Sequence, residues 1–248
     1  MCLITLAYHI HPRFPLVLAA NRDEFHERPT APAGWWSDAP HLLAGRDLRA
    51  GGTWLGITRQ GNFAALTNHR DLRRAPKQGP SRGLLVRTAL EGTATLDDTA
   101  GYEGFNLLYG PLEALRYHNN IEPADAALEP GIHGLSNALL NTPWPKVQRA
   151  KAAMERALNS SDAALVDELF ALLTDPQQAS EEGLPDTGLA LPMERALSSV
   201  FIDTTGYGTR CSTVLLVHAD GRIHFEERTW PMGTTERETF MIGEGQLG

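Results

Sequence analysis

The sequence predicts a single α+β domain, because strand-like segments gather at both ends of the chain and helix-like segments follow one another in the middle. Its 248 residues are enough to bury one large core. A regular alternation of strands and helices would instead indicate a doubly wound sheet, and the chain lacks it. No internal repeat, low-complexity tract or linker is visible, so we expect one domain over residues 1–248.

The first part of the chain is rich in apolar, β-branched runs that are separated by turn residues. The expected strands here are residues 3–8, 14–23, 53–58, 62–68, 105–110 and 114–119. Their short connections predict three hairpins, the first of which joins 3–8 to 14–23. Residues 28–52 are rich in Pro, Gly and Trp without clear periodicity, which predicts a long ordered loop.

Three segments in the middle of the chain are predicted to be helices: residues 81–92, 146–159 and 161–175. In the second of them, apolar residues recur at every third or fourth position. Ser81 fits the N-cap of the first helix, and Ser161 or Asp162 fits that of the third.

The last part of the chain returns to strand-like segments after a polar stretch, 176–193, that predicts a loop. The expected strands are residues 199–204, 209–219, 222–230 and 237–242. Asp220-Gly221 lies between two of them and is a strong hairpin signal.

Net charge and hydropathy exclude some classes of binding partner for this protein. The formal net charge is −8 and the sequence pI is about 5.6, which argues against nucleic acid because phosphate binding needs a concentrated basic surface. No apolar run approaches the ~20 residues of a membrane-spanning helix, so we expect no membrane insertion. The N-terminus lacks the basic-then-apolar layout of a signal peptide, and we therefore expect a cytoplasmic protein. As its partner we expect a small-molecule substrate or ligand.

The two cysteines, Cys2 and Cys211, are the first candidates for chemistry. A cytosolic setting disfavours a disulfide between them, and neither has the nearby His or Cys partners of a zinc site. The chain also lacks the motifs GxGxxG, GxxxxGK[ST], HExxH and GxSxG. We expect neither a metal nor a cofactor.

The stretch NRDE at 21–24 ends a strongly apolar strand with four polar residues in a row. It can be a strand end that reaches solvent, or part of a functional site. If strands 3–8 and 14–23 pair as a hairpin, a charged group near Arg22 can approach Cys2.

The chain also carries MCLITLAY, NRDEFHERPTAP, GGTWLGIT, SRGLLV, GLSNALLNTPWPKV and GTRCSTVLLV in this order. With these motifs it resembles the NRDE-motif family from end to end, a family that includes the transport and Golgi organisation proteins of eukaryotes. That family resembles the N-terminal-nucleophile hydrolases. The resemblance implies a four-layer αββα sandwich, with two antiparallel sheets between helical layers.

The resemblance gives Cys2 a specific chemical role. A small second residue such as Cys permits removal of Met1, which would leave the thiol beside a free α-amino group whose pKa is ~7.7–8.0. One residue then supplies both the nucleophile and its base. Nearby positive charge would raise the thiolate fraction.

Cysteine-type acylases of linear amides suggest partners for Cys2. Asn68, in GNFAALTN, is similar to their oxyanion-hole asparagine, and Asn137, in LSN, is similar to a second one. Asn141, in NTP, is a rival for that second place. Their late active-site arginine matches Arg210 best.

One motif of those acylases, RNxD, departs from this chain. Asn21 and Asp23 match it, but Ala20 stands where the arginine would be. Adjacent strand residues face opposite sides, so Arg22 and Asp23 cannot both face the thiol without a bulge or a strand end. We expect Asp23 to face Cys2 and hold its amino group, with Arg22 as a further candidate.

Three hypotheses follow for the function. The first is a cysteine-type amidohydrolase that acts on a linear amide or related acyl bond through a Cys2 acyl-enzyme, with Asn21 and Trp54 binding substrate. The second is a non-catalytic carrier of haem or a lipid-like ligand in the same cleft, with Trp35, Trp36 and Trp54 as its apolar lining. The third is that Cys2 is an ordinary buried strand residue.

Overall fold

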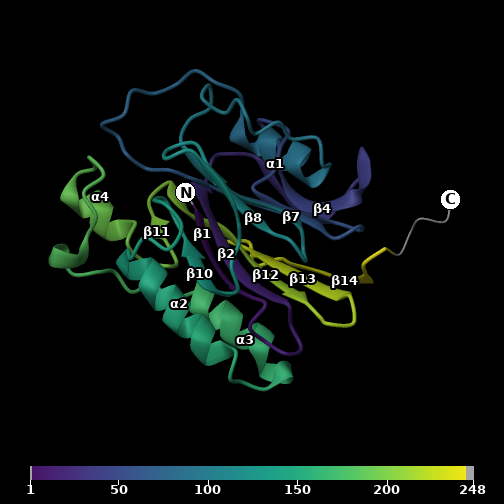
Figure 1. Cartoon of the computed structure of the whole chain (residues 1–248). Coiled ribbons are helices and arrows are strands. Elements are labelled where there is room, and N and C mark those ends of the chain that lie inside the picture. The colour runs from purple at the N-terminus through teal and green to yellow at the C-terminus, as the bar shows by residue number, and fades with distance from the viewer. Residues whose placement is uncertain (1, 244–248) are drawn as a thin grey trace.

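The structure is a computed structural model that describes residues 2–243 and consists of two antiparallel sheets between layers of helices (Figure 1). In spatial order, the first sheet holds β10 (Gly131–Leu135), β1 (Cys2–Tyr8), β2 (Leu16–Phe25), β12 (Tyr207–Val217), β13 (Arg222–Thr229) and β14 (Thr235–Met241), with β11 (Asp203–Thr204) paired to β12. The strands of this sheet come from both ends of the chain, so the termini of the fold meet in one layer.

The second sheet follows the chain in order, each strand pairing with the next. It holds β3 (Thr30–Trp36), β4 (Ala39–Asp47), β5 (Leu55–Thr58), β6 (Asn62–Asn68), β7 (Phe105–Pro111), β8 (Arg116–Asn119) and β9 (Ala124–Ala127). The helices are α1 (Arg82–Leu90), α2 (Pro145–Ala157), α3 (Asp162–Leu173) and α4 (Leu191–Ala196), with a 3₁₀ turn, η1, at Glu181–Gly183.

Three apolar clusters hold the layers together. The largest lies between the two sheets and takes Ile4 and Leu6 from β1. A second, which takes Leu3 and Ala7 from the same strand, lies between the first sheet and helices α2 and α3. The third packs α1 on the second sheet. The alternating faces of each strand therefore fill two cores, and the expected αββα sandwich is confirmed (Figure 1).

The hairpin that was expected at the N-terminus is confirmed and sets the geometry of the candidate site. β1 pairs with β2 in antiparallel register, and this register places Cys2 opposite Arg22. The expected hairpin around Asp220-Gly221 is confirmed as the β12–β13 pair. The three expected helices are present within a few residues, although Ser81 and Ser161 occupy N-cap positions without a side-chain cap hydrogen bond.

The expectation of a loop over residues 28–52 was wrong, because this segment forms the strand pair β3–β4. Its register shifts between Ala31 and Gly34, and again between Trp35 and Trp36. These irregularities break the two-residue alternation that marks a strand in sequence. β3 is also an edge strand, where the missing N–H of Pro32 costs no ladder hydrogen bond.

The expected strand at 199–204 was also wrong over most of its length, because only Asp203–Thr204 pairs, as β11. Val200 is buried in the core under α3, and the Phe201 N–H donates to the Asp175 carbonyl. Burial against helices therefore explains the apolar character of this segment. The expected loop 176–193 contains η1 and the start of α4, and β9 and β10 were not anticipated.

Within the described residues, no helix has both the length and the apolar character needed to cross a membrane.

Candidate active site

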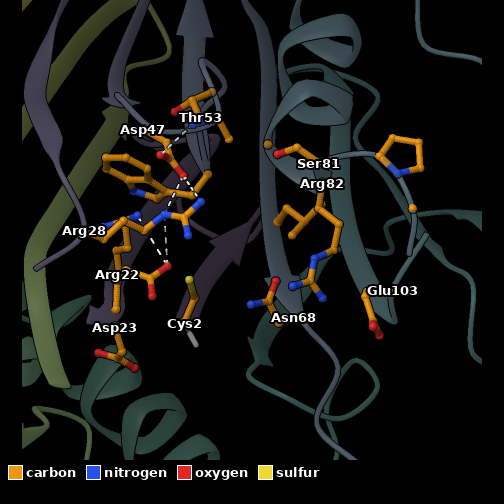
Figure 2. Close-up of a pocket in the computed structure, with 17 residues that line it drawn as sticks. Cys2, Arg22, Asp23, Arg28, Asp47, Thr53, Asn68, Ser81, Arg82 and Glu103 are labelled. Atoms are coloured by element: carbon orange, nitrogen blue, oxygen red, sulfur yellow. Dashed lines mark hydrogen bonds and ion pairs between the residues drawn. The ribbon is translucent and has the colours of Figure 1, made fainter. Parts of the chain in front are cut away.

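A cavity of about 380 Å³ opens at the end of the sandwich where β1 begins (Figure 2). One side is built by β1 and β2, and the other by the end of β6 and the segment that leads into α1. Its lining includes Cys2, Arg22, Asp23, Glu24, Arg28, Asp47, Thr53, Trp54, Asn68, Ser81, Arg82 and Glu103.

Cys2 lies at the floor of this cavity with its sulfur turned into it (Figure 2). The residue shares a strand face with Ile4 and Leu6 of the inter-sheet core, and its exposed fraction is 9%. Burial raises the pKa of the Cys2 thiol, and the positive charge of Arg22 partly offsets that rise. The thiol therefore needs a base before it can act as a nucleophile.

Arg22 is the charged residue directly opposite Cys2 in the strand pair, and its side chain lies on the same face. It is buried, and its guanidinium stacks on the ring of Trp54 at 4.4 Å from the ring centroid. A weak hydrogen bond of 3.4 Å to Thr30 and an ion pair of 3.7 Å with Glu24 complete its contacts. Trp54 thus lines the cavity as expected and holds Arg22 in place.

Our expectation that Asp23 faces the thiol in preference to Arg22 was wrong, because strand alternation turns the Asp23 side chain to the helical side of the sheet. Only 1% of Asp23 is exposed, and it accepts a hydrogen bond of 2.8 Å from the Thr209 hydroxyl. Figure 2 shows it directed away from Arg22, towards the helical layer. Asp23 still lies at the edge of the cavity, at the end of β2.

Asn21 lies on the same helical side as Asp23 and does not line the cavity. Its amide donates to the carbonyls of Leu173 and Val200 at 2.8 and 3.0 Å. Its carbonyl oxygen accepts a hydrogen bond of 2.6 Å from Ser212. These contacts tie β2 to the end of α3 and to β12, so the structure does not bring Asn21 to a position where it could bind substrate.

Asn68 lines the wall of the cavity opposite Cys2, and its side chain is directed towards Cys2 (Figure 2). Asn137 is fully buried behind it and donates a hydrogen bond of 2.8 Å to the Asn68 carbonyl. The hydroxyl of Ser136 donates to the Cys2 carbonyl at 3.2 Å. Asn137 therefore braces the backbone of Asn68, whereas the rival Asn141 accepts a hydrogen bond from the Gly134 N–H.

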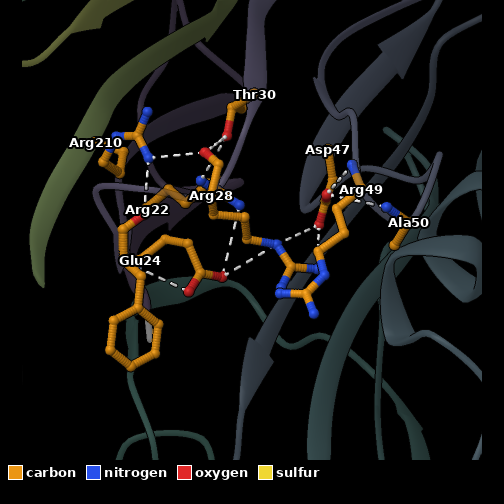
Figure 3. Close-up of polar contacts among 9 residues, drawn as sticks. Arg22, Glu24, Arg28, Thr30, Asp47, Arg49, Ala50 and Arg210 are labelled. Carbon is orange, nitrogen blue, oxygen red and sulfur yellow. Dashed lines mark hydrogen bonds and ion pairs between the residues drawn. The ribbon is translucent and has the colours of Figure 1, made fainter.

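Arg210 is not part of the cavity lining. It lies at a bulge of β12 between Thr209 and Cys211. Its guanidinium donates to the carbonyls of Phe25 and Arg28 at 2.9 and 3.0 Å (Figure 3). Arg210 thus fixes the turn that follows β2.

Sequence reasoning missed a second charged group in the cavity, formed by Glu24, Arg28 and Asp47 (Figure 3). Arg28 pairs with Asp47 at 2.7 Å and with Glu24 at 3.7 Å. Burial would raise the pKa of Asp47, but hydrogen bonds from Arg28 and from two backbone amides hold it below its usual range. No sequence signal predicts this pairing, because it depends on the β3–β4 strand pair.

Arg82, at the start of α1, is the other cationic residue that was missed. Its side chain reaches into the cavity opposite Cys2 (Figure 2) and donates a hydrogen bond of 2.9 Å to the Gly104 carbonyl. Within residues 2–243, no carboxylate forms an ion pair with Arg82. The motif SRGLLV contains Arg82, but nothing in the motif assigned it a role.

A second cavity of about 730 Å³ adjoins the first. The two share Glu24, Arg28, Asn68 and Arg82. The second is lined by apolar residues as well, namely Phe25, Leu72, Leu189, Met193 and Leu197. Trp35 and Trp36 line neither cavity. A ligand with a polar end near Cys2 and an apolar part would fit the two together.

Solved structures with a similar chain path include an N-acylethanolamine-hydrolyzing acid amidase ortholog from Caenorhabditis elegans. It has a TM-score of 0.45 and 11% identity, over 87% of this chain and 92% of that one. A mutant of the conjugated bile acid hydrolase from Clostridium perfringens has a TM-score of 0.42 and 7% identity, over 98% and 92%.

The sequence comparisons are more direct. Residues 1–231 match the family described as Transport and Golgi organisation 2. The Transport and Golgi organization protein 2 homolog of Homo sapiens is 37% identical, over 92% of this chain and 93% of its own length. The Drosophila melanogaster protein is 29% identical, over 92% of each. The family expected from the sequence motifs is thus confirmed, and the chain belongs to the Transport and Golgi organisation 2 family.

Proposed function

We propose that this chain is a cysteine-type N-terminal-nucleophile hydrolase that cleaves a linear amide, or a related acyl bond, through a thioester on Cys2. One observation carries the proposal: the Cys2 sulfur opens into a cavity in which Asn68 faces it and Arg22 lies alongside. A nucleophile, an amide donor and a fixed positive charge are the groups that acyl transfer requires.

The first step of this reaction is activation of the thiol. Burial raises the pKa of Cys2, so few thiolates form at neutral pH without a base. Removal of Met1 would supply that base as the α-amine of Cys2 itself, whose ordinary pKa of ~7.7–8.0 suits proton transfer near neutral pH. The sulfur then attacks the substrate carbonyl while its proton moves to the amine.

The second step is stabilisation of the tetrahedral intermediate. The side-chain amide of Asn68 is the donor that faces Cys2 in the cavity. A donor of this kind is typically worth about 3 kcal/mol of transition-state stabilisation. The proton on the α-amine then passes to the leaving amine, the C–N bond breaks, and water hydrolyses the thioester that remains on Cys2.

The test is to trap that thioester. Protein with its natural N-terminus is mixed with a panel of N-acyl amides and activated acyl esters, quenched in acid, and its intact mass is measured. We expect a mass increase of one acyl group that maps to Cys2, absent from Cys2→Ala and retained in Cys211→Ala. Acyl adducts that persist in Cys2→Ala would overturn the proposal.

The adjoining apolar cavity favours a second candidate, a non-catalytic carrier of haem or a lipid-like ligand. Its volume of about 730 Å³ is nearly twice that of the cavity at Cys2, about 380 Å³. The carrier predicts unchanged affinity for such a ligand in Cys2→Ala and no acyl adduct on the unaltered protein. The hydrolase predicts the adduct.

A further inference from the structure

The first turn of α2 places a lysine inside the molecule. Only 1% of Lys146 is exposed, and its Nζ makes no hydrogen bond with any residue that the structure describes. α2 packs on β1 and β10 of the first sheet, so Lys146 lies in the layer beneath the strand that begins with Cys2. An ammonium group without compensation is costly at such a site.

The buried carboxylate of Asp23 can compensate it. The charged and titratable groups around Lys146 are Asp23 of β2, Cys2 of β1, Arg70 after β6 and Arg149 of α2. Asp23 is the carboxylate among them, and it faces the helical side of the sheet. Burial lowers the pKa of Lys146 to about 8, and Asp23 is the main influence that opposes this fall.

Lys146 in turn affects the pKa of Asp23. Burial raises the pKa of Asp23, and Lys146 is the largest influence that holds it down. Arg22 and the Thr209 hydroxyl lower it less, while Tyr207 and Cys2 also face Asp23. Lys146 therefore does most to keep a buried carboxylate ionised.

The register of β1 and β2 places this carboxylate near the start of β1. Cys2 is opposite Arg22, so Asp23 is level with the position just before Cys2 in this antiparallel pair. Removal of Met1 would leave the α-amine of Cys2 at the end of β1 that is nearest Asp23. An ionised Asp23 can orient this amine and stabilise the ammonium that forms when the amine takes the thiol proton.

We propose that Lys146 is a positioning residue for the nucleophile: its ammonium keeps Asp23 ionised, and Asp23 orients the α-amine of processed Cys2. The inference rests on the proposed function. The proton moves from the Cys2 thiol to the amine and then to the leaving group. Lys146 takes no part in this proton transfer, so the charge balance closes without another reactant.

The test measures how fast iodoacetamide alkylates Cys2 across about pH 5 to 9, in processed protein that carries Cys211→Ala. Lys146→Met removes the charge but keeps a side chain of similar length. Asp23 then takes up a proton at higher pH, so we expect the acid limb of the rate profile to move up by about one pH unit or more. Lys146→Arg restores the charge and is expected to restore the limb.

The outcomes separate this inference from the function on which it rests. An acid limb that stays in place in Lys146→Met, while Cys2 of the unaltered protein remains more reactive than glutathione, overturns the role of Lys146 alone. A Cys2 thiol that is no more reactive than glutathione at any pH overturns the proposed function and the inference with it.

A second measurement does not depend on the folding of the Lys146 variants. The Lys146 amine is titrated by NMR in the unaltered protein and in Asp23→Asn. We expect the Asp23→Asn titration to fall to lower pH, because the carboxylate that favours the ammonium is gone. An unchanged titration would show that the two groups are not coupled, and would overturn the inference.

Discussion

The side chains of neighbouring residues in NRDE lie on opposite faces of β2. Arg22 and Glu24 point into the cavity, whereas the side chains of Asn21 and Asp23 are buried on the helical side, with Asp23 at the cavity edge. A two-residue period dictates this division, and the sequence alone shows the period. It does not show which face holds the thiol, because that depends on the register in which β1 and β2 pair.

The charge of Arg22 is expected to tune the thiol. Because the guanidinium favours the thiolate, Arg22→Met should raise the pKa of the Cys2 thiol further. The alkaline limb of the Cys2 alkylation profile would then move to higher pH. The alkaline part of the profile therefore reports on the Cys2 thiol, whereas the acid part reports on Asp23.

Arg22→Lys is the matched variant, because it keeps the charge and loses the flat stack on Trp54. We expect it to leave the thiol pKa close to that of the unaltered protein. A thiol pKa that falls in Arg22→Met would contradict the electrostatic role that we assign to Arg22.

At the scale of elements, strands with regular alternation and tight turns could be predicted, and irregular ones could not. β1, β2 and β12 carry long apolar runs, and Asp220-Gly221 marks the turn between β12 and β13, so these four strands could be predicted. β3 and β4 carry bulges, prolines and glycines, and they were missed. Because β4 was not predicted, Asp47 at its end was not recognised as part of the cavity.

A glycine of β4 shows what the missed strand pair does for the site. A Cβ built on Gly45 would lie 2.2 Å from the ring of Trp54, so the indole occupies the space that any other residue would fill. Gly45 thus lets Trp54 pack closely beneath Arg22. The close packing of Trp54 therefore explains why a glycine stands at position 45.

Gly45→Ala is expected to displace Trp54 and destabilise the protein by about 2 kcal/mol, as overpacking usually does. Urea unfolding measures the loss, and slower Cys2 alkylation would report the displaced Arg22. Gly34→Ala, on the neighbouring strand, is the control, because its Cβ would meet nothing within 4 Å. Equal losses in the two variants would contradict the role of Trp54 packing.

At the scale of the whole molecule, the cavity is assembled from segments that lie far apart in the chain. Cys2, Arg22, Asn68 and Arg82 come from β1, β2, β6 and α1, on both sheets and one helical layer (Figure 2). The sequence motifs MCLITLAY, NRDE, GNFAALTN and SRGLLV contain these four residues, and the resemblance suggested roles for Cys2, Arg22 and Asn68. Arg82 could not be predicted from sequence, because its position depends on how α1 packs on the second sheet.

The same long-range packing explains the sites that sequence reasoning misplaced. Arg210 looked like an active-site arginine, but a bulge in β12 directs it to the carbonyls that follow β2. Asn21 matched a motif position, but its side-chain amide donates a hydrogen bond to Leu173 in the helical layer. A motif fixes a position in the chain, whereas a bulge or a packed helix decides where the side chain points.

The central claim is that Cys2 becomes an N-terminal nucleophile, and one measurement tests it most directly. Protein purified from its native host is treated with a limiting amount of a thiol-reactive electrophile, and its intact mass and labelled peptides are determined. The account predicts a mass without Met1 and a label on Cys2 well ahead of the buried Cys211. A mass that retains Met1, with Cys2 unlabelled, would contradict it.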